Sequence, residues 1–249
     1  MIIIKTADEI KKIRASCHLL ALAMEELKKA VSAGRRTKDF DVLAEKLVEK
    51  YQARPSFKGY HGYPASICVS VNNELVHGLP SEKVIKNGDI VSLDFGLLYQ
   101  GYYSDMAVTV GVGEISAQAK ELIKITEASL FEGIDQIKPG NHLGDISAAV
   151  QEFVEARGYS VVRNLTGHGV GKAVHEPPAI PNFGNPGTGP ILKAGMVLAL
   201  EPMVNVGGYE TKLAADGWTF ETKDGSLSAH FEHTVAVTDE GYEILTILE

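Results

Sequence analysis

Two carboxylates in this chain end the same short phrase of sequence. Asn-Gly-Asp-Ile-Val-Ser-Leu leads to Asp94, and Ala-Gly-Met-Val-Leu-Ala-Leu leads to Glu201. A second pair of acids, Asp105 and Glu232, lies in two further segments rich in strand-forming residues. Because a lone ionised carboxylate is costly to bury among apolar residues, four acids in such settings predict a shared counter-charge. A divalent metal would supply that charge.

One histidine is placed to complete such a site. His168 lies in Thr-Gly-His-Gly-Val-Gly, where the glycines let the backbone approach closely. Four carboxylates and one imidazole suit a pair of first-row divalent ions bridged by carboxylate and water. Such a pair, roughly 3.5–4 Å apart, turns water into hydroxide at neutral pH and clamps a carbonyl oxygen. The five residues therefore predict hydrolysis of an acyl bond. The alternative for each acid is a surface ion pair, which the apolar neighbours of Asp94 and Glu201 disfavour.

Two further histidines are candidates for contacting the substrate. His77 lies in Val-His-Gly-Leu-Pro and His175 in Val-His-Glu-Pro-Pro, so both belong to loops rich in glycine or proline. An isolated histidine is more often a structural or surface group, but these settings favour a place beside the cleft. The other histidines have weaker claims, because they lie in helical segments, in a loop or next to a ligand: His18, His61, His142, His230 and His233.

Helices and strands must bring these side chains together. Apolar residues spaced by three and four predict two helices in each half of the chain. The first begins at a capping box of Thr6 and Glu9 and ends at Gly34, and the third stops at Pro139–Gly140. We expect Gln100–Gly101 to be a tight turn and Gly184–Gly189 to be a loop at the rim of the cleft. Segments rich in β-branched and apolar residues predict the strands Ile67–Asn72, Asp89–Tyr99, Tyr102–Val110, Val197–Val204 and Ala229–Thr238.

The helical patterns and the first pair of acids repeat at a nearly constant shift along the chain. We therefore predict a single catalytic domain, residues 1–249, made of two similar halves near residues 1–113 and 114–249. Each half runs helix, helix, strands, and helices flanking a shared antiparallel or mixed sheet give an α+β architecture. An approximate two-fold axis between the halves would bring the four acids together.

Composition narrows the class of protein. The chain has 249 residues, a formal net charge of −8, 45% hydrophobic and 22% charged residues, which is ordinary for a globular protein with a sizeable core. The negative charge disfavours nucleic-acid binding as the main function. Two cysteines, Cys17 and Cys68, cannot build a disulfide framework, and no apolar run has membrane-spanning length. We expect a cytoplasmic, monomeric protein that does not bind membranes.

The five predicted ligands, in their order along the chain, resemble those of the type I methionine aminopeptidases. The local phrases match too: Gly-His-Gly-Val-Gly around His168, Glu-Pro-Met from Glu201, and Asp-Gly-Trp-Thr at 216–219. The resemblance covers essentially the whole chain. It implies the pita-bread fold, with pseudo-two-fold halves around a curved sheet, and a metallopeptidase that removes initiator methionine when the second residue is small. The implied substrates are nascent polypeptide N-termini, and contact with the ribosome would fit that role.

The resemblance also implies a role for each ligand. Asp94 would chelate one of two divalent ions, His168 and Glu201 would hold the other, and Asp105 and Glu232 would bridge them. Glu201 would also accept the proton of the attacking water. The metal remains open, because such sites accept several ions and availability decides, so Co, Mn, Fe, Zn and Ni are all candidates.

The remaining implied residues surround the substrate. His175 and His77 would position the scissile amide and stabilise the tetrahedral intermediate. The methionine pocket would comprise Tyr60, Tyr63, Cys68 and Trp218, and a polarisable thioether packs well against aromatic edges. Two residues depart from the common bacterial pattern, since Phe57 replaces a frequent cysteine and Val174 a frequent phenylalanine.

Three other classes of protein fit part of this pattern. An Xaa-Pro aminopeptidase or dipeptidase of the same fold shares the five ligands but usually carries a large extra N-terminal domain, whereas here the metal-binding unit begins almost at residue 1. A type II enzyme would carry a long helical insertion between His168 and Glu201, for which the interval is too short. A non-catalytic, ribosome-associated binding relative would typically have lost ligands, and all five are present.

Overall fold

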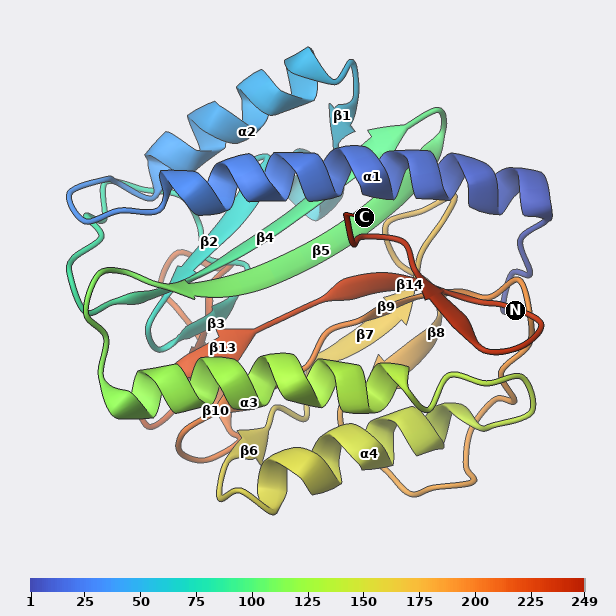
Figure 1. Ribbon diagram of the computed structural model, residues 1–249. Coiled ribbons are helices and arrows are strands. Elements are labelled where there is room, and N and C mark those ends of the chain that lie inside the picture. The colour runs from blue at the N-terminus through green and yellow to red at the C-terminus, as the bar shows by residue number, and fades with distance from the viewer. Residues whose placement is uncertain (249) are drawn as a thin grey trace.

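The computed structural model describes residues 1–248. Its elements follow the order helix, helix, strands, and this order occurs twice along the chain (Figure 1). The four helices are α1 (Ala7–Ala30), α2 (Lys38–Lys50), α3 (Ala117–Ile134) and α4 (Leu143–Glu155). No helix in this part of the chain combines the length and the apolar character needed to cross a membrane.

The helix ends test two predictions. The capping box at the start of α1 is confirmed, because the Thr6 hydroxyl accepts from the Glu9 N–H and the Glu9 carboxylate accepts from the Thr6 N–H. The predicted end at Gly34 is wrong. α1 stops at Ala30, and Gly34, with φ 90°, lies in the following turn, where its N–H donates to Ile85. Likewise α3 ends at Ile134, before the proline and glycine that were expected to stop it.

All strand pairs within residues 1–248 are antiparallel, and the α+β fold class is confirmed. The first half contributes a sheet in which β4 lies between β2 and β5, and β1 also pairs with β4. Its strands are β1 (Arg54–Pro55), β2 (Ile67–Val71), β4 (Ile90–Tyr99) and β5 (Tyr102–Gly111).

The second half contributes a five-stranded sheet of order β15-β14-β9-β7-β8. Its strands are β7 (Thr166–Gly169), β8 (Glu176–Pro181), β9 (Val197–Leu200), β14 (His233–Val237) and β15 (Tyr242–Ile244). Two smaller sheets are formed by β13 (Ser228–His230), β10 (Met203–Asn205) and β6 (Ser160–Val161), and by β11 (Thr211–Leu213), β12 (Phe220–Thr222) and β3 (Glu74–Val76). The two large sheets meet at an isolated antiparallel bridge between Ala107 of β5 and Glu232.

Two predicted strands are each interrupted at an acid. Val197–Val204 is divided into β9 and β10 by Glu201 and Pro202, and Ala229–Thr238 is divided into β13 and β14 by Phe231 and Glu232. Pro202 has no N–H for a strand ladder, and the N–H of Glu232 donates to Ala107 instead of continuing its own sheet. The prediction of two continuous strands is therefore wrong, and each break includes a predicted metal ligand, Glu201 or Glu232.

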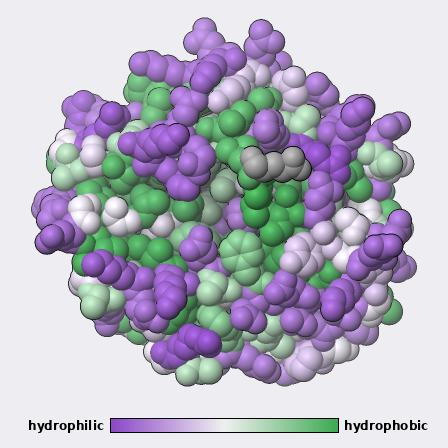
Figure 2. Space-filling view, viewed as in Figure 1, coloured by the Kyte–Doolittle hydropathy of each residue, from purple (hydrophilic) through white to green (hydrophobic). Residues whose placement is uncertain are grey.

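The helices and the predicted ligands lie on opposite faces of the strands. Figure 1 shows α1 and α3 running in front of the sheets, and α1 residues such as Leu20 and Met24 pack in one core with Leu93 of β4. Successive strand residues point to opposite faces, so Asp105 and Met106 face different sides of β5. Met106 lines a groove between α1 and α3 whose lining is both polar and apolar, and Figure 2 shows hydrophobic and hydrophilic residues side by side on this face.

The loop at Gly184–Gly189 does not rim the cleft, which corrects that prediction. It packs against the start of α4, where the Gly187 N–H donates to the Asp145 carboxylate at 2.7 Å and the Gly144 N–H donates to the Thr188 carbonyl at 2.9 Å. The loop thereby satisfies donor groups at the helix N-terminus that would otherwise lack partners.

Candidate metal centre and substrate pocket

The β4–β5 hairpin positions two of the predicted ligands. Gln100 and Gly101 connect the strands with φ angles of 50° and 78°, the left-handed pair that a type I′ turn requires. The resulting register places Asp94 opposite Ala107 and Asp105 opposite Gly96. Because opposite residues share a face and alternate residues return to it, the two aspartates are diagonal neighbours on one face.

Glu232 reaches the same face from the other half of the chain. Its N–H donates at 2.9 Å to the carbonyl of Ala107, the residue opposite Asp94 across the hairpin. Two residues further on, the Thr234 hydroxyl donates to the Asp105 carbonyl at 2.7 Å and accepts from the Asp105 N–H at 3.2 Å. The segments that carry Asp105 and Glu232 are therefore held together by hydrogen bonds.

The second sheet supplies the remaining two ligands. His168 of β7 lies opposite Ala199 of β9, and Glu201 follows the end of β9. The Nδ1 atom of His168 lies 3.0 Å from the Gly169 carbonyl, so we assign the proton to Nδ1, which leaves the Nε2 lone pair free. That Nε2 atom lies 3.6 Å from Glu201 Oε1 and 3.9 Å from Asp105 Oδ2.

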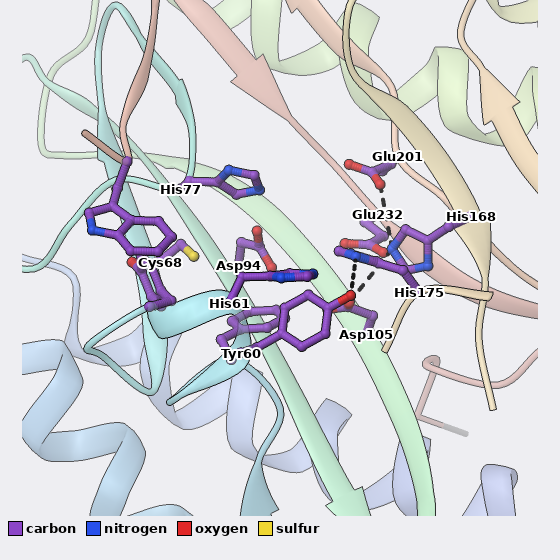
Figure 3. Close-up of a pocket in the computed structure, with 13 residues that line it drawn as sticks. Tyr60, His61, Cys68, His77, Asp94, Asp105, His168, His175, Glu201 and Glu232 are labelled. Atoms are coloured by element: carbon purple, nitrogen blue, oxygen red, sulfur yellow. Dashed lines mark hydrogen bonds and ion pairs between the residues drawn. The ribbon is translucent and has the colours of Figure 1, made fainter. Parts of the chain in front are cut away.

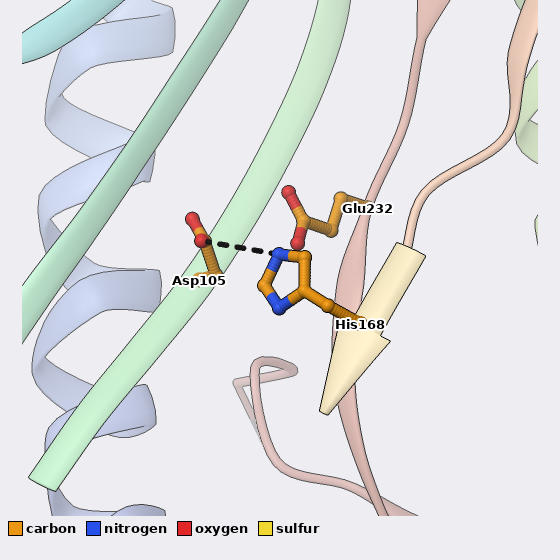
Figure 4. Close-up of side chains that lie close together, drawn as sticks. All are labelled: Asp105, His168 and Glu232. Atoms are coloured by element: carbon orange, nitrogen blue, oxygen red, sulfur yellow. Dashed lines mark ion pairs between the residues drawn. The ribbon is translucent and has the colours of Figure 1, made fainter. Parts of the chain in front are cut away.

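The structure brings all five predicted ligands into one pocket (Figure 3). Three of them form a tighter group, because one donor atom each of Asp105, His168 and Glu232 lies within 4.8 Å of the other two (Figure 4). Glu201 lies next to this group, because its Oε1 atom is 3.6 Å from His168 Nε2. Asp94 lines the same pocket from β4, the strand beside that of Asp105.

Burial makes this arrangement electrostatically unfavourable without a cation. Desolvation raises the pKa of Asp94 to about 7 and that of Glu201 to about 8. Burial, together with the neighbouring acids, also raises the pKa values of Asp105 and Glu232 well above their usual range. The pKa of His168 is lowered to about 3, mainly by burial, so its imidazole is neutral and able to bind a metal.

The side chains present fit a divalent metal. Asp94 Oδ1 and Glu232 Oε1 are buried without a hydrogen-bond partner. Among the described residues that line the pocket, none is lysine or arginine, so the chain offers no cation of its own there. Buried unpaired carboxylate oxygens are rare in folded proteins unless an ion satisfies them. Oxygen donors with a single imidazole suit first-row divalent ions.

An aromatic wall closes the pocket beside the acids. The cavity measures about 180 Å³ and includes all four residues of the predicted methionine pocket, Tyr60, Tyr63, Cys68 and Trp218. The Tyr63 and Trp218 rings meet edge to face with centroids 5.3 Å apart, and the Tyr63 hydroxyl donates to the Gly78 carbonyl at 3.1 Å. Phe57 also lines the cavity, whereas Val174 is buried outside its lining.

Both predicted substrate-contacting histidines line the pocket. The Nδ1 atom of His175 lies 3.1 Å from the Tyr60 hydroxyl, and its ring meets the His168 ring with centroids 4.2 Å apart (Figure 3). His77 has φ 56° and its ring packs against Phe220 at 5.7 Å. Burial lowers the pKa of His77 to about 4, so this imidazole is neutral near pH 7.

Two histidines with weaker predicted claims also lie at the site. His61 lines the pocket, and its place between two tyrosines in Gly-Tyr-His-Gly-Tyr was a usable signal. His230 is 1% exposed, and its Nε2 lies 3.5 Å from Glu201 Oε2. The weaker claims predicted for the others agree with their positions: His18 is exposed on α1, His142 caps α4, and His233 lines the groove between α1 and α3 on the opposite face.

Comparison with known proteins gives a consistent result. The model of metallopeptidase family M24 matches residues 11–239. A methionine aminopeptidase of Clostridium perfringens is 51% identical over 249 residues, covering 100% of both chains. The crystal structure of a methionine aminopeptidase from Thermotoga maritima matches with a TM-score of 0.98 and 49% identity, again over 100% of both chains. The prolidase from Pyrococcus furiosus matches with a TM-score of 0.82 and 27% identity, and only 66% of its chain is covered.

Proposed function

This chain belongs to metallopeptidase family M24, and on that premise we propose that it removes the N-terminal methionine from nascent proteins and peptides whose second residue is small. The observation that carries this proposal is a single small cavity that is lined by aromatic side chains on one side and by the acidic cluster on the other. At about 180 Å³ it is smaller than the roughly 300–1,000 Å³ pockets of drug-sized ligands, which favours one side chain as occupant.

A groove of about 550 Å³ begins on the other side of the same histidines. His77, His168, His175 and Glu201 border both spaces, and the groove continues along the residues Leu165, Thr166, Ala179 and Met203. A substrate can thus place its first side chain in the cavity and its following residues in the groove. The scissile bond then lies at the acids, as an aminopeptidase requires.

The ligand assignment is part of this proposal. Asp94 would hold one divalent ion, His168 and Glu201 the other, and Asp105 and Glu232 would bridge them. When bound, such ions polarise the scissile carbonyl and lower the pKa of water. Glu201 accepts the proton of the attacking water, because its carboxylate borders both the acidic cluster and the substrate groove.

The two pocket histidines act on the amide. His175 is held at Nδ1 by the Tyr60 hydroxyl, so its Nε2 is the atom available to the substrate. A hydrogen bond from this position stabilises the charge that develops on the carbonyl oxygen. His77 faces the same space from the opposite side and orients the substrate.

Replacing His175 by alanine tests this role separately from metal binding. We expect the variant to lose about 10²–10³-fold in kcat, the typical cost of removing one preorganised donor. Its metal affinity, measured by isothermal titration calorimetry, should stay close to that of the unaltered protein. Unchanged turnover would remove His175 from the mechanism.

A peptide panel tests the substrate assignment. We expect cleavage of Met-Ala and Met-Gly peptides. Leu-Ala peptides should be cleaved little, because the aromatic cavity is shaped for an unbranched thioether. Met-Lys peptides should also be cleaved little, because their second residue is not small. Xaa-Pro peptides represent the alternative activity. Preference for proline at the second position, whatever the first residue, would show an Xaa-Pro enzyme instead. The weaker match to the prolidase already disfavours that alternative.

We further propose that the protein meets these substrates in the cytoplasm, as a monomer, where nascent chains emerge from the ribosome. The free thiols of Cys17 and Cys68 suit a reducing compartment.

A further inference from the structure

A buried ion pair joins the N-terminal segment to the wall of the substrate groove. The ammonium of Lys5 donates to Glu176 Oε2 at 2.7 Å, and the two side chains are 3% and 4% exposed. In every other lysine or arginine ion pair within residues 1–248, the basic side chain is at least 34% exposed. Ionised groups are seldom buried without a partner, so this contact is a specific feature of the interior.

The carboxylate of Glu176 organises the loop that carries His175. Its Oε1 atom accepts from the Lys172 N–H at 2.5 Å and from the Ala173 N–H at 3.1 Å. The loop is the turn of the β7–β8 hairpin, in which Glu176 pairs with Gly169. The residue before Glu176 is His175, so the loop that folds around this carboxylate also presents the pocket imidazole.

Lys5 is itself fixed in place. Its N–H donates to the Gly195 carbonyl at 2.8 Å, just before β9. The side chain packs so closely on Gly171 that a Cβ added at that glycine would lie 2.7 Å from Lys5 Cε and 3.2 Å from Glu176 Oε1. The backbone hydrogen bond to Gly195 therefore fixes the position from which Lys5 reaches the turn. The close packing at Gly171 leaves little room for Glu176 to contact another partner.

By contrast, the imidazole of His175 is exposed to the pocket. Within residues 1–248 it makes one hydrogen bond, to the Tyr60 hydroxyl, and its ring also packs against the His168 ring. Tyr60 lies in a turn whose residues Gly59 and His61 have φ angles of 86° and 49°. The backbone of the hairpin turn is therefore needed to fix the position from which His175 faces the pocket.

We propose that Lys5 is a positioning residue for His175, acting through Glu176. The inference rests on the proposed function, because it concerns the imidazole that acts on the substrate amide. Loss of the ammonium leaves a buried carboxylate without its charged partner, and the turn must rearrange to solvate it. Asp94 and Asp105 lie on β4 and β5, and Glu201 follows β9, so these acids are not part of this turn and the acidic cluster is unaffected.

The experiment compares Lys5→Met, Lys5→Arg and the control Lys11→Met, an exposed lysine on α1. For Lys5→Met we expect kcat on a Met-Ala peptide to fall about 10–100-fold, the cost of a displacement of the order of 1 Å at a reacting group. KM and metal affinity should change less than about threefold, since the pocket and the acids stay in place. Lys5→Arg should restore most of the activity, and Lys11→Met should match the unaltered protein.

A double variant shows whether Lys5 acts through His175. In a His175→Ala background, Lys5→Met should lower kcat no further, because the group that it positions is absent. An additional loss there, or a wild-type kcat in Lys5→Met alone, overturns the proposal. If Lys5→Met does not fold, the variant Lys5→Met with Glu176→Gln removes both charges, and its kcat should still be reduced.

A spectroscopic readout keeps this inference separate from the proposed function. The imidazole nitrogen resonances of His175, assigned by their loss in His175→Ala, should shift in Lys5→Met and remain in place in Lys11→Met. Absence of peptide cleavage by the unaltered protein would refute the proposed function but leave this measurement intact. Unshifted resonances would refute the positioning role of Lys5, whatever the activity.

Discussion

Replacement of Asp105 or Glu232 by alanine is expected to abolish turnover. Each carboxylate belongs to the tight group with His168, and each would bridge the two ions in the proposed assignment. Losing a bridge removes the group that holds two charges together, and metal catalysis supplies several kcal/mol of transition-state stabilisation. We therefore expect kcat/KM to fall by about 10³-fold or more, since each 1.4 kcal/mol is a factor of ten.

The measurement combines peptide hydrolysis at saturating metal with titration of metal by calorimetry. Binding should weaken and its stoichiometry should fall in both variants. Glu240→Ala, an exposed acid in the turn between β14 and β15, serves as the control and should behave like the unaltered protein. Wild-type activity in Asp105→Ala or Glu232→Ala at saturating metal would contradict the bridging assignment.

Removal of the metal is expected to reverse how stability depends on pH. In the metal-free protein, burial raises the pKa of Asp94 to about 7 and that of Glu201 to about 8, whereas unfolded acids titrate near 4. Between about pH 4 and pH 8 the native state thus holds more protons than the unfolded state, so its stability falls as pH rises. A metal binds only the deprotonated acids, and its affinity rises over the same range.

Thermal unfolding with chelator and with added Mn or Co measures this difference. The increase in Tm caused by metal should be small near about pH 5.5 and much larger near about pH 8.5. Calorimetry in buffers of different ionisation enthalpy should show protons released on binding near pH 7. In Asp94→Asn, part of both effects should disappear. A metal-induced Tm increase that does not vary with pH would show that the buried acids are ionised before the metal binds.

The sequence was informative where residue type and local context agree. Asp94 and Glu201 were recognisable as unusual because acids rarely follow uninterrupted apolar runs, and the turn at Gln100–Gly101 followed from the glycine between two strands. These features depend only on residues that are close together in the sequence. The α+β class followed in the same way, because the helical and strand periods each extend over many residues.

The interruption at Glu232 could not be predicted, because it depends on a contact between the halves. The interruption of Val197–Val204 has a local cause, since Pro202 lacks the N–H that a strand ladder needs. The N–H of Glu232 donates to the carbonyl of Ala107, which lies more than a hundred residues away in the sequence. The burial of His230 and of Lys5 depends equally on tertiary structure, since nothing in their neighbouring residues distinguishes them from surface groups.

The bridge between Ala107 and Glu232 has a consequence for biogenesis. Of the five proposed ligands Glu232 is synthesised last, so a partly made chain lacks a bridging carboxylate, however well its first hairpin has folded. Binding of the cation by all five residues would therefore require that the two halves have already packed together, and the bound ion would stabilise that tertiary arrangement. An isolated N-terminal fragment would carry two aspartates on a hairpin and no working catalyst.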